Sequence, residues 1–419
     1  MSINTSWEIK IGSVASPTNF TSRVLSMNIQ QSVDVNVIGT GICQITLLNK
    51  DGALTPGGGG TYSSTDWFAE GVFVSALTNV GGADTNTPVF HGVVTNFTLV
   101  DDGVFSTVTI TALDGLTVAG RAVPAAIPIA VNINYVGAIT NVLSNVGRTY
   151  VQYPKLGKTV GVGAYTNLGD GDERIETQTT TFNSAADLLQ TAFVPSANDV
   201  MWPTTITESG INASYTVVSL PFYNTRSVLN TVDLEFAPSG FVSGTKLPFS
   251  AESFTQSFNN DTLISTAIIK GLKAGLTEQS ESSANITTYG SRTVAFTSTF
   301  SESDIASDTM ASKLVTRYGT SRFTPTSLSV TASMIKSQAA SGAHSRWYNL
   351  LSITSGIWQK ATITWTGSGA SSQTAESVIK GRTINVTPAD TEVILFLGNW
   401  LDNHSFILNS DKLNVNFLG

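Results

Sequence analysis

The segment ICQITLLNKDG, residues 42–52, decides the fold class because a strand pattern runs straight into a turn. Residues 42–48 are apolar with Thr and Gln interspersed, as in a strand with one buried side. The next four residues, Asn-Lys-Asp-Gly, are turn formers, and Gly52 can take the positive φ that a tight turn requires. The segment predicts a chain built from short strands and tight turns.

The rest of the N-terminal part repeats this alternation. Residues 71–77 and 89–99 are strand candidates, and the Asp-Asp-Gly at residues 101–103 predicts a hairpin turn. Residues 104–112 then alternate, with Val108 and Ile110 on one face and threonines on the other. A series of this kind is typical of a β-barrel or a β-sandwich.

Two stretches depart from the pattern. Residues 24–35 alternate poorly, and the four glycines of residues 57–60 predict a mobile loop outside any sheet. Ser/Gly-rich stretches at residues 253–257, 280–284 and 366–372 read as loops or linkers.

Three segments have helical spacing. Apolar residues recur at three- and four-residue steps in residues 136–146 and again in residues 183–193, before Pro195. The clearest helix is predicted over residues 301–318, where Ser301 with Asp304 resembles a capping pair. The remaining predicted strands are residues 232–236, 262–270, 293–299, 325–332, 360–366, 378–386, 391–396 and 405–408.

Composition narrows the class of protein. A chain of 419 residues is longer than the size at which a single hydrophobic core stops growing, so two to four domains are expected. The charged share of 12% is about half the usual value, so the surface is neutral and polar. A net charge of -8 argues against a surface that tracks nucleic-acid phosphates. The N-terminus lacks a signal-peptide pattern and no apolar run reaches bilayer length, so we expect synthesis in the cytoplasm and no membrane anchor.

Ionisable residues give little sign of chemistry. The histidines, His91, His344 and His404, are widely separated and are interpreted as turn or surface residues rather than ligands. The single cysteine, Cys43, lies in an apolar stretch and is predicted to be a buried thiol. No nucleophile elbow, zinc-protease pattern or phosphate-binding glycine loop occurs. No catalytic, cofactor-binding or metal site is therefore predicted.

Three weaker alternatives stay open. The acidic run from Asp170 to Glu173 could hold Ca²⁺, although a solvated acidic turn is preferred because calcium-loop spacing is absent. Carboxylates for glycoside hydrolysis would have to come from Asp101, Asp102 or Asp114, and we do not favour that reading. Aromatic residues could line a sugar-binding face, but core packing at alternating strand positions is the default. These aromatic residues are Trp347, Tyr348, Trp358 and Trp365.

Several blocks in a shared order resemble the minor tail or tail-hub proteins of long-tailed bacteriophages. An early strand ends in Leu-x-Asn-x-Asp-Gly and a Pro-containing loop, and Phe-x-Gly and Asp-Leu blocks follow. Departures are Asn409, where the family usually has Asp, and residues 27–35, where it has an Arg-rich segment. The blocks are residues 43–56, 90–94, 108–116, 289–292, 305–318, 325–328, 378–381, 386–388 and 406–409.

The resemblance implies a mainly β, multidomain fold with tail-tube-like antiparallel β-barrels and a few short amphipathic helices, as in phage baseplate hubs. It implies a first hub barrel in residues 1–121, a small α+β insertion in 122–210, a β-rich part completing the hub barrels in 211–300, and a helix with a C-terminal β domain in 301–419. Each boundary is an expectation.

The resemblance also implies a role without catalysis. Such a subunit joins a sixfold tail tube to a threefold tip in the virion, works as a homotrimer and needs no cofactor. Its implied partners are the distal tail or tail tube protein, the tape-measure protein and a tip fibre or spike protein, with genomic DNA passing through the lumen. The alternative is a tail-tip module that binds host-surface glycans through the aromatic residues around Trp358.

Overall fold

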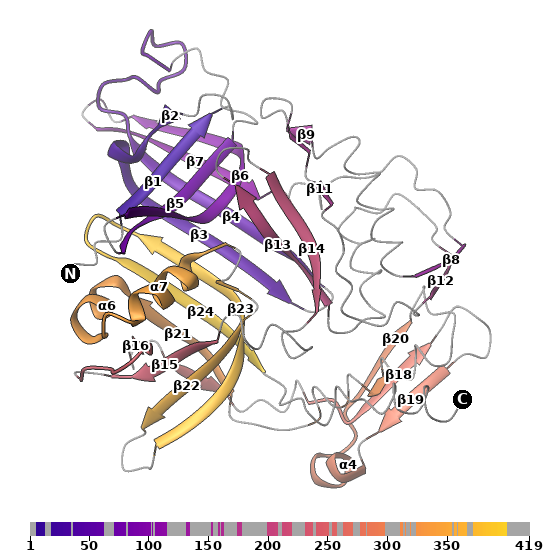
Figure 1. Cartoon of the computed structure of the whole chain (residues 1–419). Helices are drawn as coiled ribbons and strands as arrows, with labels where there is room; N and C mark the ends of the chain where they lie inside the picture. The colour runs from indigo at the N-terminus through magenta and orange to yellow at the C-terminus, as the bar shows by residue number, and fades with distance from the viewer. Residues whose placement is uncertain are drawn as a thin grey trace.

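In the described part of the protein's computed structural model, strands greatly outnumber helices (Figure 1). The residues that the structure describes are 6–12, 18–34, 37–62, 71–80, 83–101, 103, 105–114, 131–134, 152–153, 158–159, 161–162, 174–177, 199–207, 212–219, 231–237, 240–250, 254–257, 263–270, 277–281, 283–297, 311–312, 315, 319, 324–353, 356–357, 359–366 and 372–399.

One large sheet contains most of the N-terminal and C-terminal strands. Its N-terminal members are β1 (Ser6–Gly12), β2 (Thr18–Asn19), β3 (Val24–Asp34), β4 (Val37–Leu48), β5 (Gly71–Val80), β6 (Ala83–Asp101) and β7 (Ser106–Asp114). Its later members are β15 (Val232–Phe236), β16 (Leu247–Phe249), β17 (Thr255–Ser257), β21 (Thr324–Thr331), β22 (Lys360–Thr366), β23 (Ser372–Val386) and β24 (Thr391–Asn399).

The two groups meet where β3 pairs with β23. The strand order is β16-β15-β22-β23-β3-β4-β7-β6-β5-β1-β2, and β24, β21 and β17 branch from β23. The β3–β23 pair is antiparallel and runs from Met27 opposite Val386 to Ser32 opposite Gly381. Strands more than 300 residues apart in sequence thus form one continuous hydrogen-bonded sheet.

Smaller elements complete the described residues. They are the 3-10 helix η1 (Thr21–Arg23), the helices α4 (Ser283–Tyr289), α6 (Ala332–Gln338) and α7 (Ala343–Leu351), and the strands β8 (Val131–Asn134), β9 (Gln152–Tyr153), β10 (Lys158–Thr159), β11 (Gly161–Val162), β12 (Arg174–Thr177), β13 (Asp199–Thr207), β14 (Asn212–Ser219), β18 (Thr266–Lys270), β19 (Thr277–Glu281) and β20 (Thr293–Thr297). Within the described part of the chain, no helix is both long and apolar enough to cross a bilayer.

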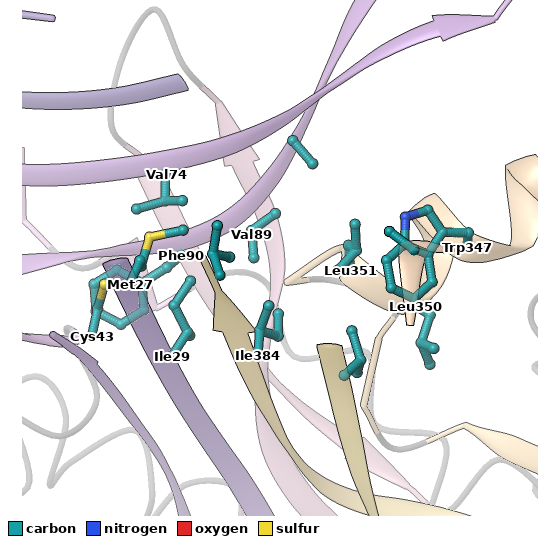
Figure 2. Close-up of a cluster of buried hydrophobic side chains, with 14 of the residues drawn as sticks. Met27, Ile29, Cys43, Val74, Val89, Phe90, Trp347, Leu350, Leu351 and Ile384 are labelled. Atoms are coloured by element: carbon teal, nitrogen blue, oxygen red, sulfur yellow. The ribbon is translucent and has the colours of Figure 1, made fainter. Parts of the chain in front are cut away.

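A single hydrophobic core joins the two groups of strands and the helix α7. Ile29 of β3, Ile384 of β23 and Leu351 of α7 all belong to one cluster of buried side chains (Figure 2). Two backbone-directed bonds also tie α7 to the N-terminal strands. The Tyr348 hydroxyl donates to the Leu77 carbonyl at 3.4 Å, and the Ile353 N–H just after the helix donates to the Pro88 carbonyl at 2.8 Å.

The segment that decided the fold class behaves as its residues indicate. β4 ends at Leu48, and Gly52 takes a φ of +65° in the turn that follows. Asn49 organises this turn, because its Oδ1 accepts from the Leu54 N–H at 2.8 Å. The glycine-rich loop lies outside the sheet, as predicted, and folds back so that the Tyr62 N–H donates to the Ala53 carbonyl at 2.9 Å.

The mainly β class is confirmed, but several local predictions are wrong. The segment 253–257, read as a loop, contains β17, and the segment 280–284, also read as a loop, contains the end of β19 and the start of α4. Residues 24–35, which alternate poorly, contain the long strand β3. Helices α6 and α7 were not predicted, although the buried residues Ala343, Trp347 and Leu351 of α7 recur at four-residue steps, as in a helix.

The three predicted helices fall largely outside the described residues. The segments 136–146 and 183–193 lie entirely outside them, as does the strand predicted at 405–408. Of the helix predicted over 301–318, the described residues 311, 312 and 315 are helical, and Ala311 and Val315 are buried.

Candidate interaction surface

One face of the large sheet carries hydroxyl and amide side chains across seven neighbouring strands. Residues that lie directly opposite each other on paired strands point to the same face. We define the polar face as two rows of such residues together with Gln30, Ser32 and Thr383. The first row is Asn96, Thr111, Gln44, Asn28, Asn385, Glu392 and Thr331, and the second is Thr98, Thr109, Thr46 and Ser26.

The polar face is wide, solvent-accessible and almost uncharged. Seven strands spaced by about 4.8 Å give a width of about 29 Å. Its side chains are exposed or half-buried, and Glu392 is the one ionisable residue within the defined rows. The face therefore presents hydrogen-bonding groups without a strong field of either sign.

Cross-strand hydrogen bonds fix several of these side chains. The Asn28 Nδ2 donates to the Asn385 Oδ1 at 2.6 Å, across the β3–β23 pair. The Asn385 Nδ2 in turn donates to the Glu392 Oε2 at 3.1 Å. Because the amide groups satisfy one another, the surface is orderly before any partner arrives.

Apolar side chains occur at the margins of the polar face. On β24, Phe396 is 46% exposed, and at the β6–β7 hairpin Val100 is 57% and Phe105 50% exposed. Exposed large apolar groups of this kind are candidates for contacts with other subunits.

The opposite side of the same strands is the inner face, which packs into the core. The side chains of Ile29, Ile45, Val108, Ile384 and Val393 alternate with those of the polar face and are fully buried. The strands thus show period-two burial, and buried side chains of helix α7 belong to the core cluster on their inner side.

The histidines predicted as turn or surface residues lie elsewhere. His91 is only 2% exposed, on β6, and its ring centroid lies 6.4 Å from that of Phe73, so the prediction was wrong. His344 is half-buried in α7, and burial lowers its pKa. His404 lies outside the described residues, as do the acidic residues Asp170 and Glu173.

The other ionisable candidates do not form a reactive centre in the described part of the chain. Cys43 is buried as predicted, and burial raises the pKa of its thiol. Asp101 accepts from the Gly103 N–H at 2.9 Å and so shapes the hairpin turn, whereas Asp114 is 4% exposed at the end of β7. Asp102 lies outside the described residues, which contain no group of three or more His, Cys, Asp or Glu side chains suited to a metal.

Of the candidate aromatic residues, Trp347 and Tyr348 pack into the core from helix α7, whereas Trp365 packs against it from strand β22. Trp347 is fully buried in α7 and Tyr348 is 7% exposed. Trp365 is partly buried, with its ring centroid 5.4 Å from that of Phe254. Trp358 lies outside the described residues. The buried Trp347 ring has no free face for a sugar.

One notable residue was missed from the sequence. Arg382 is fully buried on the inner face of β23, and burial lowers the pKa of its guanidinium to about 9. Period-two spacing could have found it, because Arg382, Ile384 and Val386 share one face of a strand.

Two solved structures with a similar fold are tail proteins. The tail protein from Neisseria meningitidis MC58 matches with a TM-score of 0.57 at 10% identity, over 94% of this chain and 96% of that one. The 43 kDa tail protein of prophage MuSo2 from Shewanella oneidensis matches with a TM-score of 0.54 at 11% identity, over 94% of this chain and 98% of that one.

Comparison by sequence adds nothing to this result. No protein-family model matches the chain, and no curated protein matches it. The resemblance drawn from the sequence blocks is thus confirmed at the level of fold: this chain folds like phage tail proteins along nearly its whole length.

Proposed function

We propose that the chain is a structural, non-catalytic hub subunit of a phage-type tail, located in the virion at the distal tip. The observation that carries the proposal is the continuous sheet through β3 and β23, together with the tail-protein fold. Each chain brings two β-rich halves into one sheet, so three copies would present six such halves. A trimer could in this way adapt a sixfold tube to a threefold tip.

The low share of charged residues fits a subunit whose surface contacts neighbouring subunits. Interface cores are depleted in charged residues, and this chain is only 12% charged. In the proposed assembly the chain contacts the distal tail or tail tube protein, the tape-measure protein and a tip fibre or spike protein. The four-part division at residues 1–121, 122–210, 211–300 and 301–419 belongs to the same proposal.

In this proposal, genomic DNA passes along the polar face. A polyanion is held by clustered Lys and Arg, and the defined rows contain neither. DNA in transit would meet hydrated hydroxyl and amide groups that neither trap it nor repel it strongly. Among the carboxylates of this acidic chain, Glu392 alone lies in these rows.

A cryo-EM map of the intact particle tests the assembly. We expect three copies at the distal tip, and mass photometry of the purified protein should show a species at three times 44.2 kDa. A stable monomer that is absent from the tip map would contradict the proposal.

A charge-insertion experiment tests the passage surface. Particles carrying Asn28→Lys, Gln44→Lys and Thr111→Lys should deliver their genome more slowly, because three added cations would bind passing phosphates. The matched control places the same three charges on Ser243, Thr245 and Ser341, which are exposed beside the α6–α7 turn. Equal delivery rates for the two particles would contradict passage along the polar face.

A further inference from the structure

Arg382 joins three elements through neutral acceptors. Its Nε and Nη2 both donate to the Oε1 of Gln31 on β3, at 2.9 and 2.6 Å. Its Nη1 donates to the carbonyl of Leu350, in the last turn of α7. Gly356 leaves the room for this bond, since a Cβ there would overlap Nη1.

Burying these polar groups costs free energy that an apolar core would not cost. Arg382 has no accessible surface, and Gln31 is 2% exposed, so both polar groups are desolvated. The Gln31 Nε2 has no hydrogen-bond partner among the described residues, so even this pair is incompletely satisfied. Replacing a buried polar cluster by apolar side chains of similar volume is often neutral or stabilising. Stability alone therefore does not explain Arg382.

The register of β3 against β23 offers an explanation for Arg382, because the pattern of apolar residues does not fully determine that register. A slip of one residue between β3 and β23 would turn the apolar side chains outward and is strongly disfavoured. A slip of two residues keeps every side chain on its own face. The native inner pairs, Ile29 with Ile384 and Met27 with Val386, would then give way to another apolar pair, such as Ile29 with Val386.

The same two-residue slip would be costly for Arg382. Its position would move from opposite Gln31 to opposite Ile29 or Val33, according to the direction of the slip, and its guanidinium would lose the acceptor of two hydrogen bonds. A buried charge without acceptors is among the most unfavourable states of a protein interior.

We propose that Arg382 and Gln31 fix the register of β3 against β23, and thereby the position of the C-terminal strands relative to the N-terminal strands. Arg382 and Gln31 act by raising the free energy of the slipped arrangements. The bond from Arg382 to the Leu350 carbonyl holds helix α7 in place relative to the same strands. This role is independent of what the assembled particle does.

Cysteine pairs on the polar face can read the register directly. Asn28→Cys with Asn385→Cys reports the native register, because these residues are directly opposed. Asn28→Cys with Thr383→Cys, and Gln30→Cys with Asn385→Cys, report the two slips. In the native register each slip pair is diagonal, at about 7–8 Å, and should cross-link poorly. The native Cys43 is fully buried and does not compete.

The test compares these pairs in the native background and in Gln31→Leu/Arg382→Met. The native background should cross-link through the native pair alone. The double variant should fold, with a Tm within a few degrees of the native protein, and should also cross-link through at least one slip pair. Gln31→Leu alone should lower the Tm more than the double variant does, since it leaves the guanidinium without its main acceptor.

Two results would overturn the proposal. If the double variant folds and cross-links only through the native pair, the register is set elsewhere. If the double variant is unfolded, Arg382 serves stability rather than register.

Discussion

The two faces of the β4–β3–β23 strands show how one backbone serves two environments. Toward the core, Ile45, Ile29 and Ile384 are fully buried and contribute through packing. Toward solvent, the directly adjacent Gln44, Asn28 and Asn385 lie on an accessible surface, where the Asn28 side chain donates to that of Asn385. The comparison shows that the inner face carries the stability of the sheet, while the polar face is free to meet other molecules.

The largest expected difference lies between neighbouring residues on β4. Ile45→Ala removes a fully buried side chain and should lower the free energy of unfolding by about 2–5 kcal/mol. Gln44→Ala, one residue away on the polar face, should change it by less than about 0.5 kcal/mol. Urea denaturation of both variants measures the contrast. Similar losses in the two variants would mean that the faces do not divide their roles in this way.

Cys43, on the inner face, should make the stability of the protein depend on pH. Burial raises the pKa of its thiol, so the folded state keeps the proton while the unfolded state releases it near pH ~8.5. Stability from this group is complete below that pH and should fall by about 1.4 kcal/mol for each pH unit above it. Denaturation at rising pH, compared with Cys43→Ala, measures the slope.

The thiol reagent DTNB gives an independent reading of the same group. We expect Cys43 to react slowly in the folded protein and rapidly in urea, because the thiolate is the reactive form. Rapid reaction of the folded protein would show that this part of the inner face is open to solvent.

The division into faces could be predicted from the sequence where alternation was regular. In β7, Val108 and Ile110 are buried and Thr107 and Thr109 are half-buried, as residues 104–112 predict. In β3 the pattern fails because a buried polar residue, Gln31, occupies an inner position that spacing assigns to an apolar one. Its partner Arg382 is 351 residues away, so no local pattern reveals why Gln31 is tolerated.

Pairing between distant strands was beyond prediction for a similar reason. Local spacing gives strands and hairpins, such as β6 and β7 around Gly103, but not the β3–β23 pair that unites the sheet. The polar face was therefore not predicted as a surface, although most of its strands were. The composition did indicate its character, because a chain with few charges must present hydroxyl and amide groups to solvent.

A smaller effect is expected from the amide pair that spans β3 and β23 on the polar face. Asn28→Ala removes the 2.6 Å bond to Asn385 and should lower the free energy of unfolding by about 0.5–1.5 kcal/mol. Asn385 keeps its bond to Glu392, which limits the loss. The matched control is Gln30→Ala, an exposed residue on the same strand and face. A loss of stability in the control as large as that in Asn28→Ala would assign the effect to the strand rather than to the amide bond.

The smallest effect should come from the hydroxyl pair between β4 and β7. The Oγ1 atoms of Thr46 and Thr109 lie 3.4 Å apart, a long contact on a half-buried surface, so Thr46→Val should change stability by no more than about 0.5 kcal/mol. Val keeps the β-branched shape that favours a strand, which isolates the hydroxyl from the packing. If Thr46→Val is instead stabilising and promotes self-association in mass photometry, then the hydroxyl serves to keep this face hydrated, and the threonines of the polar face owe their presence to solubility and passage rather than to the fold.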